Sequence, residues 1–248
     1  MSAISPSLLS LIRTQRVAAP GNGESLLLLF KAPASGTSLD EVDQRLLRAD
    51  EAARATRFRR PEDRDAFVAA RIVVRTLLAG WRGLDPGSIE FQYSTHGKPS
   101  LLNAGDLHFN VAHCGRWVAM AFADVPVGVD IEAPLTASRT AMALAGFLAP
   151  REREALTRCP ESRRSELFIR FWTLKEAYLK ARGIGLSVAL DSFEFELSID
   201  KPDIGFLSPS DDRADGWQFV SADVCGSLRW ALAMNSSIPR SNPAVIEL

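Results

Sequence analysis

Apolar positions along the chain recur with a helical period in some segments and a strand period in others. In residues 61–82 the apolar side chains are spaced as on one face of a helix, and Pro61-Glu62-Asp63 suits a first helical turn. We predict further helices at roughly 139–147, 151–157 and 163–182. Glycines at positions 83 and 183 are expected to end the first and the last of these four helices.

Short runs rich in β-branched and aromatic residues predict strands between these helices. They lie near 89–93, 107–113, 117–124, 127–132, 192–199, 217–224 and 228–234. Cys114-Gly115-Arg116 joins two of them and predicts a hairpin, and a similar hairpin sequence recurs at Cys225-Gly226-Ser227. A chance likeness of two hairpins is the alternative to an internal duplication.

The order of helix, strands and hairpin therefore occurs twice. We predict an α+β fold of two similar subdomains, related by pseudo-twofold symmetry, with boundaries at 1–126 and 127–248. A ligand site is expected between the two halves. Residues 1–23, which contain two prolines and two glycines, are expected to form a flexible arm.

Composition narrows the class of protein. The 248 residues are 46% hydrophobic, which describes an ordinary globular chain and excludes collagen, disorder and coiled coil. The net charge of -1 argues against a nucleic-acid binder with a uniformly basic surface. The apolar run 26–30 is too short to span a bilayer, so we expect a cytoplasmic protein.

The three cysteines, at positions 114, 159 and 225, are an odd number with wide spacing and no CxxC pair. This pattern excludes a disulfide framework or a zinc knuckle and fits a reducing compartment. We expect all three to be buried thiols.

Charge is unevenly distributed along the chain. Residues 54–75 hold seven arginines against three acids, and residues 151–183 hold nine cations against five anions, a local charge of +4 in each case. Residues 184–248 hold ten acids against four bases. The basic stretches are either solvated helix faces or the walls of an anion pocket.

Two carboxylates stand two positions apart in the segment 127–132. On a strand, Asp130 and Glu132 would point to one face while Val129 and Ile131 fill the other. Adjacent anions repel unless a cation neutralises them, and Mg²⁺ binds one or two carboxylates together with substrate phosphates. The other reading is an exposed strand end.

A second chemical cluster lies on the predicted helix 163–182. Glu176 and Lys180 are spaced i, i+4, which is the spacing of a surface ion pair. The same pair could serve phosphoryl transfer, with the acid binding metal or taking a proton and the cation meeting a departing phosphate. His113 and Cys114 are not expected to form a nucleophilic pair, because neighbours on a strand face opposite ways.

Together these segments resemble the 4'-phosphopantetheinyl transferase superfamily. Its signature is a G-[VI]-D-[IL]-E strand followed by W-[ST]-x-K-E-[AS]-x-x-K, and this chain has Gly-Val-Asp-Ile-Glu at 128–132 and Trp-Thr-Leu-Lys-Glu-Ala-Tyr-Leu-Lys at 172–180. The resemblance extends through Gly-Lys-Pro at 97–99 and Phe-Asn-Val-Ala-His-Cys-Gly-Arg-Trp at 109–117, and covers roughly residues 54–200. The length matches the surfactin-type branch, in which one chain is a pseudo-dimer.

The resemblance implies transfer of phosphopantetheine from coenzyme A to a serine of an acyl or peptidyl carrier protein, with release of adenosine 3',5'-bisphosphate. Asp130, Glu132 and Glu176 resemble the Mg²⁺ ligands. Glu176 also resembles the base for the carrier serine, directly or through a water, and Lys180 the group that neutralises or protonates the leaving phosphate. The positions that resemble coenzyme A contacts are Arg57, Arg71, Lys98, His113 and Lys175.

One position departs from the family pattern. Ala112 stands where a serine hydroxyl commonly helps to hold phosphate, and its loss removes about 0.5–1.5 kcal/mol of net hydrogen bonding. A catalytically inert module that binds coenzyme A or a carrier protein, and a metal-dependent phosphohydrolase, are the competing functions. We expect a monomer with no nucleic-acid or membrane partner.

Overall fold

The computed structural model describes residues 12, 17–34, 46–102, 105, 107–197, 202–207, 212–224, 226 and 228–248. Within these ranges the helices of four residues or more are α3 (Ala49–Ala55), α4 (Pro61–Arg82), α5 (Ser138–Leu144), α6 (Pro150–Arg158) and α7 (Glu161–Arg182). Its strands are β1 (Ser25–Lys31), β2 (Phe91–Tyr93), β3 (Pro99–Leu101), β4 (His108–Cys114), β5 (Trp117–Ala123), β6 (Val127–Glu132), β7 (Phe193–Leu197), β8 (Pro202–Phe206), β9 (Trp217–Val224), β10 (Leu228–Asn235) and β11 (Ala244–Glu247).

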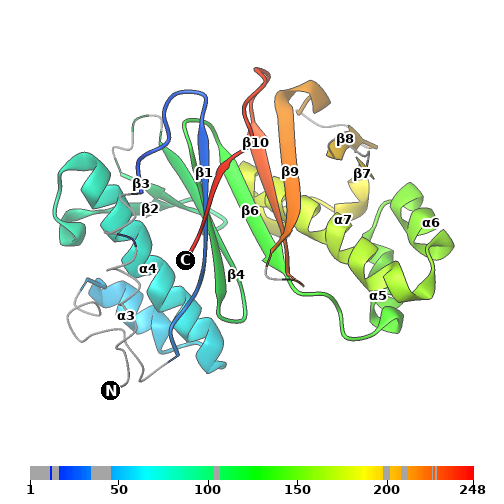
Figure 1. Ribbon diagram of the computed structural model, residues 1–248, viewed down its shortest axis with the longest axis horizontal. Coiled ribbons are helices and arrows are strands. Elements are labelled where there is room, and N and C mark those ends of the chain that lie inside the picture. The colour runs from blue at the N-terminus through cyan, green and yellow to red at the C-terminus, as the bar shows by residue number, and fades with distance from the viewer. Residues whose placement is uncertain are drawn as a thin grey trace.

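Two sheets face each other in the middle of the molecule, and a long helix covers the outer face of each (Figure 1). The first sheet has the strand order β11-β1-β5-β4 and packs against α4. The second has the order β6-β10-β9 and packs against α7. The chain is therefore α+β, as the sequence predicted.

The two halves repeat one order of elements. A strand, a long helix, a two-stranded hairpin and two antiparallel strands follow one another, first as β1, α4, β2–β3, β4 and β5, and then as β6, α7, β7–β8, β9 and β10. Both long helices have 22 residues and end at a glycine in the left-handed region, Gly83 and Gly183. The strand β11 lies outside this repeat, because it pairs in parallel with β1.

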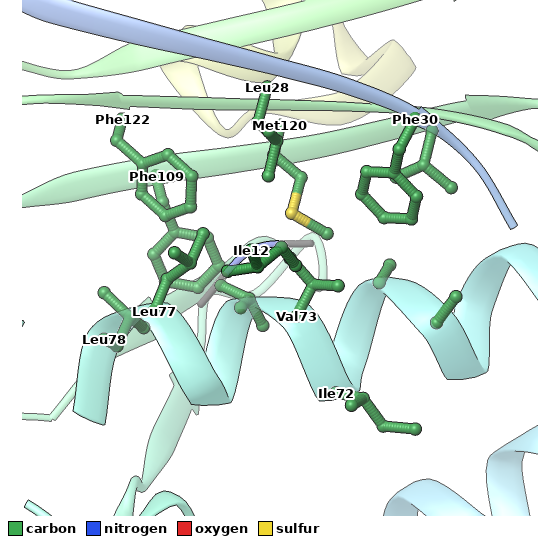
Figure 2. Packing of buried hydrophobic residues seen from close by; sticks show 14 of the residues in the cluster. Ile12, Leu28, Phe30, Ile72, Val73, Leu77, Leu78, Phe109, Met120 and Phe122 are labelled. Carbon is green, nitrogen blue, oxygen red and sulfur yellow. The ribbon is translucent and has the colours of Figure 1, made fainter. Parts of the chain in front are cut away.

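Side chains of the first sheet fill the space between that sheet and α4. Figure 2 shows Met120 and Phe122 of β5, with Leu28 and Phe30 of β1, pointing toward the apolar face of α4. Intervening residues of β1, Leu27 and Leu29, point instead into the core between the two sheets. Because β1 is buried on both faces, its sequence is a continuous apolar run without a period of two.

Several predicted boundaries are confirmed and others change. The helices 61–82 and 163–182 and the strands 127–132 and 217–224 lie where the pattern placed them, and 107–113 and 117–124 form the predicted hairpin. The helix expected at 139–147 is α5 followed by a 3-10 turn. Of the strands in the described part of the chain, the pattern missed β1, β3, β8 and β11.

The predicted flexible arm is only partly described. Residues 1–11 and 13–16 lie outside the described part of the chain, but Ile12 and Val17 are buried in the first core, and the Trp81 indole donates to the Val17 carbonyl at 2.8 Å. The arm is therefore packed at these residues. No helix in the described ranges has the length and apolar character needed to cross a bilayer.

The cysteines differ from the prediction in burial. Cys114 and Cys159 are free thiols, yet both are half-buried rather than buried. Cys225 lies outside the described residues, as does part of the second predicted hairpin loop.

Candidate active site

The strand β6 lies directly against α7 because residue 128 is a glycine. A Cβ atom at Gly128 would lie 2.1 Å from the carbonyl oxygen of Ala177 and 2.2 Å from the backbone nitrogen of Ala181. No larger side chain fits there without separating the strand from the helix. This close approach brings the acidic face of β6 next to the Glu176 and Lys180 face of α7.

Asp130 and Lys180 meet across this contact. The Lys180 Nζ lies 2.5 Å from Oδ1 of Asp130. Asp130 is buried, with 4% of its surface exposed. Burial alone would lower the pKa of Lys180, but the ion pair with Asp130 and the charge of Glu176 raise it overall. The charged partner of Lys180 is thus Asp130 on the neighbouring strand, and the simple surface pair between Glu176 and Lys180 is not what the structure shows.

Two further carboxyl groups flank this ion pair. Burial, reinforced by the charge of Asp130, raises the pKa of Glu132 to about 7. Burial also raises the pKa of Glu176, with Lys180 opposing the shift and Asp130 adding to it. Both acids therefore exchange protons closer to neutral pH than an exposed carboxyl group does.

The donor chemistry of this cluster suits a hard cation. Oδ2 of Asp130 is buried and has no hydrogen-bond partner among the described residues, and oxygen ligands from carboxylates are those that Mg²⁺ prefers. As the side chains stand, no group of three His, Cys, Asp or Glu residues within the described ranges is close enough to hold a metal ion. The charges of Asp130, Glu132 and Glu176 influence one another, but the three carboxyl groups do not form a closed coordination shell.

A pocket of about 410 Å³ opens beside this cluster, between α4, β4, the β2–β3 turn and the end of α7. Part of its wall is apolar, with Phe58, Phe67 and Val74. Basic side chains also line it: Arg54, Arg71, His96, Lys98, His113 and Lys180. A molecule with apolar surface and several anionic groups would match this wall.

Arg71 is held in this wall by aromatic rings and one acid. Its guanidinium lies 5.4 Å from the ring centre of Phe67 and 5.3 Å from that of Phe91, and its Nε lies 3.8 Å from Oε1 of Glu51. Burial lowers the pKa of Arg71, with Tyr93 and Glu51 opposing the shift. Arg75, one helical turn further along, is fully buried. Its Nε lies 2.9 Å from Oε2 of Glu51, and this ion pair is part of the core rather than of the pocket.

His113 reaches the pocket from β4. Its Nδ1 lies 3.9 Å from Oδ1 of Asp63, in the first turn of α4. Burial lowers the pKa of His113, and the charge of Asp63 partly opposes this shift. Ala112 precedes it in the same wall and offers no hydroxyl group.

Lys98 lines the pocket, but its ammonium group lies on backbone carbonyls. Nζ donates to the Val127 carbonyl at 3.0 Å and to the Ala181 carbonyl at 2.8 Å. Burial lowers the pKa of Lys98 to about 8.

Two predicted coenzyme contacts lie elsewhere. Lys175 is fully buried in the second core, where Nζ pairs with Glu152 at 2.9 Å and donates to the carbonyls of Leu190 and Phe193. This position does not favour the predicted coenzyme contact, because all three N–H donors of Lys175 are used inside the core. Arg57 is exposed and lines a neighbouring open depression, beside Phe58 and Tyr93.

Two residues that shape the site, Asn110 and Gly128, were given no role of their own from the sequence. Oδ1 of Asn110 on β4 accepts a hydrogen bond from the backbone nitrogen of Val129 at 2.9 Å, which joins the two sheets next to Asp130. Both residues stand within the motifs that carry the family resemblance. The available signal was an Asn between Phe109 and Val111 in a predicted strand, since a buried amide group needs a hydrogen-bond partner.

Comparison with known proteins decides the family. The chain matches the family model of the 4'-phosphopantetheinyl transferase superfamily over residues 126–232, and that of the 4'-phosphopantetheinyl transferase N-terminal region over residues 39–124. The chain belongs to the 4'-phosphopantetheinyl transferase superfamily.

Individual relatives agree with this family. The chain is 37% identical over 160 residues to the 4'-phosphopantetheinyl transferase HetI of Nostoc sp., covering 63% of this chain and 67% of that protein. It is 33% identical over 153 residues to the 4'-phosphopantetheinyl transferase Sfp of Bacillus subtilis, covering 59% and 67%. With ffp of Bacillus subtilis it shares 31% identity over 166 residues, covering 66% and 73%. The predicted surfactin-type branch of the superfamily is confirmed.

Proposed function

We propose that this phosphopantetheinyl transferase superfamily member moves 4'-phosphopantetheine from coenzyme A to a serine of an acyl or peptidyl carrier protein. The serine oxygen would form a new bond to the phosphorus next to pantetheine. The bond from that phosphorus to the bridging oxygen would break, releasing adenosine 3',5'-bisphosphate. The observation that carries the proposal is the clustering of Asp130, Glu132 and Glu176 around Lys180, which itself lines a pocket with several basic side chains.

Glu176 is the proposed base. Its raised pKa suits a group that takes the serine proton near neutral pH, directly or through a water. Lys180 is proposed to neutralise or protonate the departing phosphate, and its raised pKa keeps it charged at that pH. The two residues lie one helical turn apart on α7, which places both roles on one rigid element.

Asp130, Glu132 and Glu176 would hold Mg²⁺. A bound Mg²⁺ would supply positive charge to the pyrophosphate oxygens. Support comes from the unpartnered Oδ2 of Asp130 and from the burial that raises the pKa values of both glutamates, since a bound cation would offset the cost of burying their negative charges.

Arg71 and His113 are proposed to bind coenzyme A phosphates, since both present cationic or protonatable groups to the pocket. Arg57 would extend this basic wall from the adjoining depression. We further propose that the two halves, 1–126 and 127–248, supply a complete site within one chain, so the enzyme would act as a monomer in the cytoplasm.

The direct experiment incubates an apo carrier protein with coenzyme A and follows its mass. The proposal is supported if the carrier gains the mass of one phosphopantetheine group and this addition requires Mg²⁺. A non-catalytic module that binds coenzyme A or a carrier is the second candidate, which Ala112 favours by removing a hydroxyl from the pocket wall. Calorimetric binding of coenzyme A without modification of any carrier in a panel would support that candidate. Breakdown of coenzyme A without a carrier would indicate a phosphohydrolase.

A further inference from the structure

Lys98 joins the β2–β3 turn of the first half to both elements that carry the proposed catalytic groups. Its Nζ donates to Val127, the first residue of β6, at 3.0 Å, and to Ala181, in the last turn of α7, at 2.8 Å. One side chain therefore bonds the beginning of the strand and the end of the helix at the same time.

The rest of the lysine is fixed as well. Its backbone nitrogen donates to Oγ of Ser94 at 3.1 Å, and its carbonyl oxygen accepts from the Ser94 backbone nitrogen at 2.9 Å. The aliphatic stem runs over Gly183, where a Cβ would lie 3.2 Å from Cδ of Lys98. Lys98 thus enters the contact between β6 and α7 from a well-ordered turn.

The acceptors explain why a cation is placed here. The Ala181 carbonyl is one of the last four of α7, which have no partner within the helix, and a positive charge is favourable at a helix C-terminus. Two of the three N–H donors of the ammonium are used by these carbonyls, so the group is a poor match for a phosphate ligand that needs several free donors.

We propose that Lys98 is a positioning residue of the transferase, which holds the start of β6 against the end of α7 and so sets Asp130 opposite Lys180. The catalytic part of this inference rests on the proposed function. Geometry supports it, because Val127 adjoins Gly128, where strand and helix come closest, and Ala181 adjoins Lys180. Resemblance to the family had suggested a coenzyme contact for Lys98, and the two roles predict different kinetics.

Lys98→Met keeps the stem and removes the donors. A positioning role predicts that kcat falls about 10- to 100-fold and that the Mg²⁺ concentration for half activity rises, while KM for coenzyme A changes little. Lys98→Arg, which still has donors for both carbonyls, should restore most of kcat. His113→Gln is the matched control, because His113 lines the same pocket and its ring contacts Asp63 and the backbone of Gly115. Its main effect should be on KM.

Hydrogen exchange tests the Lys98 hydrogen bonds to Val127 and Ala181 without substrate, metal or turnover. Backbone amides of residues 127–132 and of the last turn of α7 should exchange faster in Lys98→Met than in the wild type or Lys98→Arg. If Lys98→Met does not fold, Lys98→Gln, which keeps amide donors on a shorter stem, is measured in its place. A raised KM for coenzyme A with unchanged kcat and unchanged exchange would overturn the proposal and make Lys98 a coenzyme ligand. Complete inactivity of the wild type on carrier proteins would refute the proposed function. Faster exchange in Lys98→Met would still establish that Lys98 holds β6 against α7.

Discussion

The ammonium of Lys180 lies 2.5 Å from Oδ1 of Asp130, and this pair joins α7 to β6 in the middle of the candidate site. It places a cation among three acids, with Glu132 and Glu176 close enough to alter its pKa. A phosphoryl-transfer site needs both a cation and acids. The substrate brings several negative phosphate charges, and these charges are divided between the two products.

Replacing the proposed base should reduce turnover strongly. Glu176→Gln keeps the size of the side chain but cannot take a proton, so kcat should fall by roughly 10²–10⁴ in the carrier-modification assay. Glu166→Gln on the same helix is the control, since Glu166 is exposed and pairs with Arg163. Equal turnover in the wild type and Glu176→Gln would remove Glu176 from the catalytic role.

The glycine between strand and helix should be intolerant of a methyl group. Gly128→Ala would place Cβ 2.1 Å from the Ala177 oxygen, so β6 and α7 must separate. We expect the free energy of unfolding to fall by about 2 kcal/mol or more, measured by urea denaturation. Gly80→Ala in α4 has open space around its Cβ and should instead stabilise by about 0.5–1 kcal/mol. A stability loss of similar size in both variants would contradict the close-approach argument.

Lys175 should act on stability rather than on coenzyme binding. Lys175→Met leaves Glu152 buried without its cation, and breaking such a pair costs about 3–5 kcal/mol of unfolding free energy. The double variant Lys175→Met/Glu152→Gln should be less destabilised than the single one. In folded Lys175→Met, KM for coenzyme A should match the wild type, and an increase limited to KM would restore the coenzyme role.

Lys98 gives the chain a pH-dependent stability with a definite sign. Burial lowers its pKa from 10.5 to about 8 in the folded protein. Between these two values the unfolded chain binds more protons than the folded one, so the free energy of unfolding should rise with pH from about 8 to 10.5. The neutral amine keeps two N–H donors for its two carbonyl acceptors, so deprotonation does not break the hydrogen bonds to Val127 and Ala181.

Lys98→Arg is the reference for that measurement, because a guanidinium stays charged throughout the window. The wild type should gain on the order of 1–3 kcal/mol relative to this variant across the window, measured by denaturant titration at several pH values. A constant difference between the two proteins would show that Lys98 has an ordinary pKa.

Much of the site could be predicted because its elements carry strong local signals. The helix α7 is long and ends at glycine, and β6 alternates acids with branched apolar residues, so both were located from sequence. Other strands could not be predicted in this way. In β1, Leu27 and Leu29 face one core while Leu28 faces another, which removes the alternation that marks a strand. The strand β11 is short, largely exposed and defined by its partner β1.

The direction in which Lys175 points follows from helix geometry. Consecutive residues on a helix point about 100° apart, whereas residues four apart share a face. Glu176 and Lys180 share a face, so Lys175 must point elsewhere, and it enters the second core. The pairing of Lys180 with Asp130 and the position of Lys98 depend on tertiary contacts between distant segments, which no local pattern contains.

The most direct test of the account is the mass of an apo carrier protein after incubation with coenzyme A and this enzyme. We expect one phosphopantetheine group to be added when Mg²⁺ is present, no addition when Mg²⁺ is chelated, and recovery of the addition when Mg²⁺ is restored. Unchanged mass for every member of a panel of acyl and peptidyl carrier proteins, or equal modification with and without chelator, would contradict a magnesium-dependent transferase.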